Sequence, residues 1–283
     1  MEGKAVIAII LVAIICFAAG FYTYPAVVKP AAPPTPPTPA PTTWDKIVER
    51  GKIRVATSPD WPPFEYIDPE TGKIVGYEVD LMELVAERLG LEVEWVPMSF
   101  AGIISAVQAK DVDLGVSGFS ITPERCEVVQ YCIPHIITRA EVIMLKSRAE
   151  ELGITTLESL EELGEYGLTC GVEMGTTQEA ELMDLEKAGK LPAGTCKSYE
   201  NYDLAMEDMF RGAVDTVYME SPIASYWILE HPEEIVIIFS KPYWPVAWVA
   251  HQDSDVLVSK INGVLAELIA EGKVKELQEK WKV

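Results

Sequence analysis

The segments KIVGYEV, DLMELVAERLG and LEVEWVPM, which follow one another over residues 73–98, decide the fold class of this chain. The first and third segments predict strands. In the second, residues 80–90, apolar side chains recur at helical spacing, with Asp80 typical of a helix N-cap and Gly90 of a helix end. A strand, a helix and a strand in succession predict a βαβ unit, and therefore a mostly parallel sheet with helices on both faces.

The same alternation continues through the body of the chain, residues 44–283. A helix over residues 100–110 leads to a buried strand over residues 111–118, and a second series of elements includes an acidic helix over residues 154–163. The segment 241–251 predicts one more strand, ahead of C-terminal helices. The sequence thus predicts an α/β fold made of two Rossmann-like lobes with mostly parallel sheets.

The N-terminal region differs in composition from the body. Residues 5–28 carry no charge and are long enough to cross a bilayer. Three alternatives remain open for residues 1–28: an uncleaved membrane anchor, a cleaved signal, or lipidation at Cys16. Residues 29–43 are rich in proline and threonine and predict an extended linker. In each case we expect the body outside the cytosol, at the cell surface or in the periplasm, tethered to the membrane or secreted after cleavage.

Charge and composition exclude several classes of partner. The 283 residues carry a formal net charge of −21, which argues against nucleic acid or an anionic membrane surface as a partner. The histidines (His135, His231 and His251) do not combine with a nucleophile in any catalytic pattern. Neither those histidines nor the cysteines have the spacing of a metal site. We therefore expect no enzymatic activity, no metal and no cofactor.

Two loops rich in glycine, serine and threonine indicate a ligand site. DLGVSGFSITPER (113–125) and TCGVEMGTTQEAE (169–181) each connect the end of a strand to the start of a helix, where free N–H groups attract an anion. Arg125 stands in the first turn of a helix predicted to begin at Thr122. The helix dipole disfavours a cation there by a few tenths of a kcal/mol, so a bound anion would account for its position.

The body from about Trp44 resembles the extracytoplasmic solute-binding proteins of polar amino-acid ABC transporters. The matching segments are GKIRVATSPDWPPFEYID, GKIVGYEVDLMELVAERLG, FAGIISAVQAKDVDLGVSGFSITPER, GVEMGTTQE and a closing helix that ends in EKW. The resemblance implies a type II periplasmic-binding-protein fold, in which two lobes joined by two crossing strands close on a ligand. Lobe 1 would comprise residues 44–138 and 241–283, and lobe 2 residues 139–240, with the hinge at about 137–140 and 239–242.

The resemblance also implies which residues bind the backbone of an amino acid. Arg125 would hold the α-carboxylate with its two-pronged guanidinium. Donors near Ser120 and Thr177 would bind the same carboxylate. Glu220 would hold the α-ammonium together with the carbonyl of Gly118; most relatives have Asp in place of this Glu.

The residues that would choose the ligand side chain are less typical of the family. Trp61 and Phe100 occupy positions where relatives place aromatic rings around the side chain. Ser58 replaces an Asp found in many relatives, and Glu173 lies near Gln178. A carboxylate beside two aromatic faces favours a cationic side chain, arginine or lysine, ahead of glutamine. The implied function is capture of such an amino acid for an ABC permease; a sensor ectodomain or a dehydratase-type enzyme on the same fold is the alternative.

The cysteines of the body predict two disulfides, because the body is expected in an oxidising environment. Cys170 and Cys196 lie on consecutive predicted strands, which are often neighbours in a sheet. Cys126 and Cys132 flank a short predicted helix, and a bridge between them would require the chain to turn back.

Overall fold

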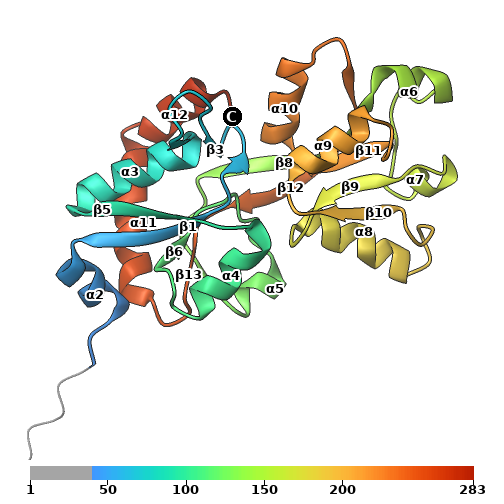
Figure 1. Cartoon of the computed structure of the whole chain (residues 1–283). Helices are drawn as coiled ribbons and strands as arrows, with labels where there is room; N and C mark the ends of the chain where they lie inside the picture. Colours follow the sequence, from blue (N-terminus) through green and yellow to red (C-terminus); the bar gives the residue numbers. More distant parts are fainter. Residues whose placement is uncertain (1–39) are drawn as a thin grey trace, which may run out of the picture. The chain divides into compact units, whose positions relative to one another are not determined.

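The computed structural model describes residues 40–283 (Figure 1). The predicted anchor or signal (1–28), its Cys16 and most of the predicted linker (29–43) lie outside these residues. Within the described part of the chain, each helix is too short or too polar to cross a bilayer.

The first of two larger sheets has the strand order β5-β1-β6-β13-β7. Its strands β5, β1 and β6 are parallel, whereas β13 runs antiparallel to β6 and β7. Figure 1 shows α3 and α4 on opposite sides of this sheet. The strands and helices of this part are β1 (Lys52–Thr57), β5 (Glu92–Pro97), β6 (Leu114–Gly115), β7 (Gln130–Tyr131), β13 (Val249–Ala250), α2 (Thr43–Arg50), α3 (Tyr77–Leu89), α4 (Phe100–Gln108), α5 (Pro123–Cys126), α11 (Asp255–Ala270) and α12 (Lys273–Trp281).

The second sheet has the strand order β10-β9-β11-β8-β12. Its strands β10, β9 and β11 are parallel, whereas β8 runs antiparallel to both β11 and β12. Both sheets therefore combine parallel and antiparallel pairs, and their alternation with helices confirms the predicted α/β fold class. The elements of this part are β8 (Ile136–Leu145), β9 (Cys170–Glu173), β10 (Cys196–Tyr199), β11 (Thr216–Glu220), β12 (Ile235–Val246), α6 (Lys146–Leu152), α7 (Glu162–Glu165), α8 (Thr177–Lys187), α9 (Tyr202–Phe210) and α10 (Ser221–Glu230).

The chain passes between the two sheets along β8 and β12. These long strands pair antiparallel, and their register shifts between Ile237 and Phe239 and again between Pro242 and Pro245. The strand predicted over residues 241–251 is in the structure the second half of β12 followed by β13. Prolines and register shifts weaken the regular ladder at this point, since a proline has no N–H to donate.

A small sheet and the start of α3 correct one prediction. The third sheet pairs β2 (Asp60–Trp61), β3 (Glu65–Ile67) and β4 (Ile74–Val75). The predicted strand 73–79 ends early because α3 begins at Tyr77, three residues before the predicted N-cap. The N–H of Tyr77 donates to the Pro63 carbonyl at 2.9 Å and that of Glu78 to the Phe64 carbonyl at 3.0 Å, so tertiary contacts satisfy the first turn. These contacts require Gly76, whose φ is 143° and whose added Cβ would lie 2.0 Å from the Phe64 oxygen.

The predicted acidic helix over residues 154–163 was also wrong. Only its end is helical, in α7, and the helix of this region, α6, lies ahead of it. The Leu157 N–H donates to the Ile238 carbonyl of β12 at 2.6 Å, which ties the segment to the sheet. The Glu162 side chain accepts from the N–H groups of Glu158 and Ser159 at 3.0 and 3.2 Å. Local side-chain bonds of this kind compete with helix formation.

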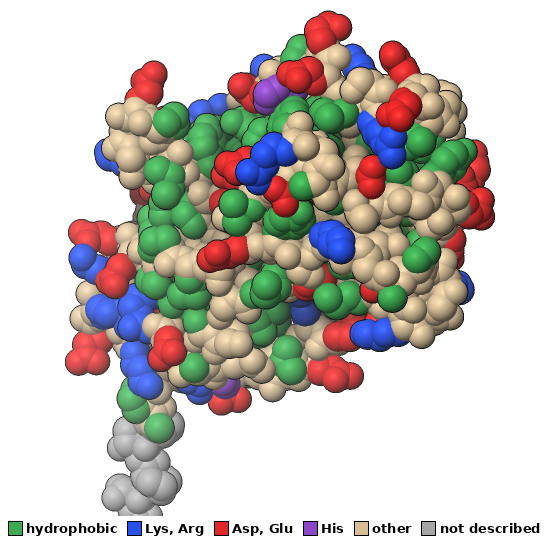
Figure 2. All heavy atoms as spheres, turned by 45° about the vertical axis from the view of Figure 1, so that its right-hand side comes forward, with side chains coloured by type: hydrophobic (Ala, Val, Ile, Leu, Met, Phe, Trp, Pro, Cys, Tyr) green, Lys and Arg blue, Asp and Glu red, His purple; other side chains and the backbone are tan. Residues whose placement is uncertain are grey.

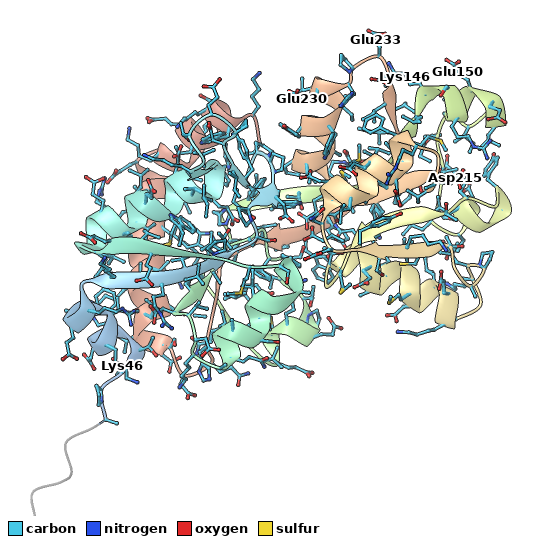
Figure 3. The ribbon with its side chains drawn as sticks, in the orientation of Figure 1. Lys46, Lys146, Glu150, Asp215, Glu230 and Glu233 are labelled. Atoms are coloured by element: carbon cyan, nitrogen blue, oxygen red, sulfur yellow. The ribbon has the colours of Figure 1, made fainter. Side chains whose placement is uncertain are left out.

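Each sheet is fixed at one end by an aspartate that precedes a central strand. Asp113, ahead of β6, accepts from the Arg54 N–H at 2.7 Å. Asp215, ahead of β11 and labelled in Figure 3, accepts from the N–H and the hydroxyl of Thr169, both at 2.9 Å. The two contacts link the start of one parallel strand to the start of its neighbour, at the edge opposite the strands' carboxyl ends.

The structure contains neither predicted disulfide, since Cys126, Cys132, Cys170 and Cys196 are all free. Cys126 is exposed whereas Cys132 is buried, so the two thiols face different surroundings. Cys170 and Cys196 are register partners on the parallel strands β9 and β10. The Cys170 thiol is directed to the carbonyl of Gly171 at 3.8 Å instead, and burial raises its pKa to about 12.

The surface carries charges of both signs. On the face that Figure 2 shows, acidic and basic side chains are scattered among apolar ones rather than gathered in a basic field.

Candidate functional site

A small, partly enclosed cavity lies where the carboxyl ends of strands from both sheets meet. Its volume is about 20 Å³, room for roughly one water molecule. An amino acid can enter only if the elements on its two sides move apart. The cavity is lined by Ser58, Asp60, Trp61, Phe100, Ser117, Gly118, Glu173, Gln178, Tyr202 and Glu220.

Glu220 is the acid at the centre of this site. It ends β11 and precedes α10, so its position follows from the strand-to-helix connection. The Ser120 hydroxyl donates to its Oε1 at 2.8 Å and the Thr138 hydroxyl to its Oε2 at 2.6 Å. Burial raises the pKa of Glu220 to about 7, although the two hydroxyls and the Arg125 charge act in the opposite direction. A bound cation would stabilise its ionised form.

Arg125 lies in the helix turn that the sequence predicted. The Thr122 side chain caps α5 by accepting from the Arg125 N–H at 3.3 Å. The guanidinium donates to the carbonyls of Ser120 and Gly175 at 3.1 and 3.0 Å, and its carbon lies 5.6 Å from the centre of the Phe100 ring. Arg125 is 9% exposed. Because both acceptors are neutral carbonyls, its positive charge is available to an anion.

The predicted residues divide between the cavity and a neighbouring groove. Seven of the ten line the cavity, but Arg125 and Thr177 line the groove, whose volume is about 980 Å³. Ser120 joins the two, since its carbonyl accepts from Arg125 and its hydroxyl donates to Glu220. Thr177 is the first residue of α8, and the side chain of Thr176 caps this helix. The Thr177 hydroxyl donates to Gln178 Oε1 at 3.3 Å.

Trp61 packs directly on the backbone of Gly118. Gly118 has a φ of 60°, and a Cβ added there would lie 2.1 Å from the Trp61 ring. Trp61 in turn contacts Phe64, with ring centres 4.6 Å apart. The loop after β6 is thus shaped so that an indole forms one wall of the cavity.

A buried polar network binds the loop after β6 at Ser117 and Gly118. Glu78 accepts from the Gly118 N–H at 2.7 Å and from the Trp248 indole N–H at 3.0 Å, and its Oε1 lies 2.9 Å from His135 Nε2. Glu65 accepts from the Ser117 hydroxyl at 2.8 Å. Burial, followed by the nearby Glu78 charge, raises the pKa of Glu65 well above its usual range.

Sequence reasoning missed this network because its members come from separate segments. It also missed three residues of the cavity wall: Asp60, Ser117 and Tyr202. Asp60 is the acid of the PDWPPF loop and precedes the predicted Trp61. This neighbouring position could have identified Asp60 as a cavity residue. Ser58, which was predicted, lines the cavity, and its N–H donates to the Ser117 hydroxyl at 3.1 Å.

Besides Glu220, the cavity wall carries two acids, Asp60 and Glu173. Asp60 Oδ1 and Glu173 Oε1 are buried and have no hydrogen-bond partner among the described residues. Gln178 Nε2 is also buried without a hydrogen-bond partner among these residues. Burial raises the pKa of Glu173 well above its usual range, and the charges of Asp60 and Asp203 add to this effect. Such groups are costly to bury unless a ligand or water satisfies them.

This fold and site define a two-part binding protein, and comparison with known proteins places the chain in a family. The model of the bacterial extracellular solute-binding proteins, family 3, matches residues 53–283, and the chain belongs to this family.

Individual relatives include ABC transporter arginine-binding protein 1 of Escherichia coli (strain K12), 26% identical, with 81% of this chain and 90% of that protein covered. A solved structure of an ancestral arginine-binding protein bound to arginine is 29% identical and has a TM-score of 0.74, over 82% of this chain and 98% of that one. A third relative is an ancestral amino acid-binding protein described as a precursor of cyclohexadienyl dehydratase. It is 29% identical, with a TM-score of 0.75 over 85% of this chain and 99% of that one.

Proposed function

We propose that the protein captures a basic L-amino acid, arginine foremost, and delivers it to the membrane permease of an ABC transporter. The observation that carries this proposal is that Ser120 links a buried cation to a buried acid. Its carbonyl accepts from Arg125, and its hydroxyl donates to Glu220. A zwitterion has one negative and one positive group a short distance apart. Arg125 suits its α-carboxylate and Glu220 its α-ammonium.

The choice of arginine rests on the two other acids of the cavity wall, Asp60 and Glu173. Glu173 is 3% exposed and one of its oxygens lacks a partner in the described chain, so a guanidinium would satisfy it. Trp61 and Phe100 offer aromatic faces for the rest of the side chain. The relatives whose printed names include arginine support the same choice.

The proposed mechanism is capture followed by closure. Arg125, Trp61 and Phe100, on lobe 1 (44–138 and 241–283), would bind the ligand while the cleft is open. Lobe 2 (139–240) would then close and bring Glu220 and Thr177 to it. The register shifts of β12 on either side of residues 239–242 support a hinge there, together with residues 137–140 of β8, where Ala140 and Arg139 pair with Lys241 and Pro242.

The proposal includes no catalytic step, although one relative is described as the precursor of a dehydratase. The hydrogen bonds of Glu220 and Arg125 suit the holding of charge rather than the transfer of a proton between them. We also propose that residues 1–28 anchor or export the protein and that residues 29–43 act as a spacer. The uncharged composition of residues 5–28 and the prolines that follow support this arrangement.

A thermal-shift screen of the twenty amino acids with the full chain tests the proposed function. Arginine should raise the melting temperature most, followed by lysine, because a ligand that binds only the folded state stabilises it by about 4 kcal/mol at a thousandfold excess over Kd. A shift with glutamine alone would contradict the choice of a basic ligand. The absence of a shift with every amino acid would contradict the proposed function itself, and turnover of the bound ligand would assign the protein to the enzymes.

We expect arginine affinity to fall as the pH is lowered below about 7, the pKa of buried Glu220. Protonation removes the charge that holds the ligand ammonium, and the limiting loss is about tenfold per pH unit. Without ligand the sign is opposite. The folded-state pKa lies above the ordinary 4.5, so the contribution of Glu220 to stability is full below about 4.5 and is lost as the pH rises to about 7.

Calorimetric titration with arginine between pH 5 and pH 8 measures this dependence. In Glu220→Gln the affinity should be low throughout and its pH slope smaller than in the wild type, since this group no longer titrates. Equal slopes in the two proteins would show that the ammonium does not depend on Glu220.

A further inference from the structure

Two carboxyl groups face the cavity from opposite parts of the fold. Asp60 lies on β2, in the loop region that follows β1 of the first sheet, and Glu173 ends β9 of the second sheet. Both line the cavity, and each has a buried oxygen without a hydrogen-bond partner among residues 40–283. Closing the site therefore brings together two acids that belong to different lobes.

The groups around this pair add negative charge or none. Asp203, on α9, and Glu200, ahead of it, raise the pKa of Asp60 after the larger effect of burial, and Ser58 is its hydrogen-bonding neighbour. Asp203 also acts on Glu173. Glu220 is a third acid on the cavity wall, and the other neighbours there, among them Phe100, Gln178 and Tyr202, are uncharged. No cation of the described chain forms an ion pair with either acid.

Two like charges that approach in a site shielded from water repel each other strongly, because the effective dielectric constant is low. The closed site then requires either that a proton bind to the pair or that a cation come between them. A guanidinium is flat, always charged and carries five N–H donors, so it can bond to two carboxylates at once. It matches both the charge and the unsatisfied oxygens.

We propose that Asp60 and Glu173 form an acidic clamp across the cleft, which makes closure of the site depend on the positive charge of the ligand side chain. This inference rests on the proposed function and adds to it a residue, Asp60, and a condition for closure. A ligand that brings no positive charge leaves the two acids facing each other. Binding of a cationic side chain releases the proton that the pair shares in its absence.

Citrulline is the ligand that isolates this effect. It has the length and shape of arginine, but a urea oxygen replaces one guanidinium nitrogen and the charge is lost. The wild-type protein should bind arginine at least about a hundredfold more tightly than citrulline, since two charge-assisted contacts are lost and a carbonyl meets a carboxylate. The α-carboxylate and α-ammonium contacts are the same for both ligands.

The test is calorimetric titration of the full chain with arginine and with citrulline. The proteins compared are the wild type, Asp60→Asn, Glu173→Gln and the double variant. Each single variant should lower the preference for arginine by about tenfold or more, and the double variant should remove it, because one charge-assisted contact is lost with each acid. Glu70→Gln makes the same change in net charge at an exposed position and should keep the wild-type preference.

Titration in two buffers of different ionisation enthalpy gives a second readout. Arginine should release more protons from the wild type than from the double variant, because Glu220, whose pKa is about 7, contributes equally in both proteins. Circular dichroism confirms that each variant is folded. If the wild type binds arginine but the variants keep its preference over citrulline, the clamp is wrong and the proposed function stands. An equal loss of preference in Glu70→Gln would also contradict the clamp, since the effect would then be one of overall charge. If the wild type binds no amino acid, the proposed function fails.

Discussion

Replacing Arg125 with alanine is expected to weaken arginine binding by at least about a hundredfold, because two charge-assisted hydrogen bonds to the α-carboxylate are lost. The guanidinium is nearly buried, and its present acceptors, the carbonyls of Ser120 and Gly175, are neutral. A ligand carboxylate in that place would lose its counter-charge in the variant while remaining shielded from water. Calorimetric titration with arginine measures the loss.

Two further variants make this result specific. Arg125→Lys keeps the charge but not the two-pronged geometry, so its affinity should lie between those of the wild type and the alanine variant. Arg211→Ala removes a cation from an exposed position at the end of α9 and should leave arginine affinity unchanged. If Arg125→Ala binds arginine with wild-type affinity, Arg125 does not hold the α-carboxylate of the ligand.

The Gly118→Ala substitution should lower both stability and affinity. Its Cβ would lie 2.1 to 2.8 Å from three ring atoms of Trp61, on a backbone with a φ of 60°. We expect the indole to be displaced and the folded state to lose about 2–4 kcal/mol, of which about 1 kcal/mol is the backbone strain. Urea unfolding measures the first effect, and calorimetry with arginine the second.

A second substitution tests whether the collision with Trp61 causes these losses. Trp61→Phe shortens the side chain that faces Gly118. In the Gly118→Ala background it should therefore recover part of the lost stability, because the smaller ring can move away from the added Cβ. If Gly118→Ala is as stable as the wild type and binds arginine equally well, the indole does not depend on this glycine.

Local pattern predicted the parts of the fold that depend on short-range contacts. The alternation of strands and helices, the cap at Thr122 and the turn that carries Arg125 all follow from residues within a few positions of one another. The start of α3 did not follow from local pattern, because its first N–H groups are satisfied by carbonyls of residues 63 and 64, across a hairpin. The segment 154–163 failed for a similar reason, since β12 accepts from Leu157.

The candidate site shows the same division. The residues expected around a ligand backbone could be named from two loops, and seven of the ten predicted site residues line one cavity. Asp60 was missed because its direction is set by the hairpin of β2 and β3, not by its neighbours in sequence. Glu78 and His135 come from different segments, so their meeting below Gly118 depends on the tertiary fold.

A crystal structure of the protein with L-arginine tests the central claim most directly. We expect the ligand between the two lobes, with its α-carboxylate on Arg125, its α-ammonium on Glu220 and its guanidinium between Asp60 and Glu173. Arginine bound elsewhere, or bound with its guanidinium toward Glu220 and its carboxylate away from Arg125, would contradict the account.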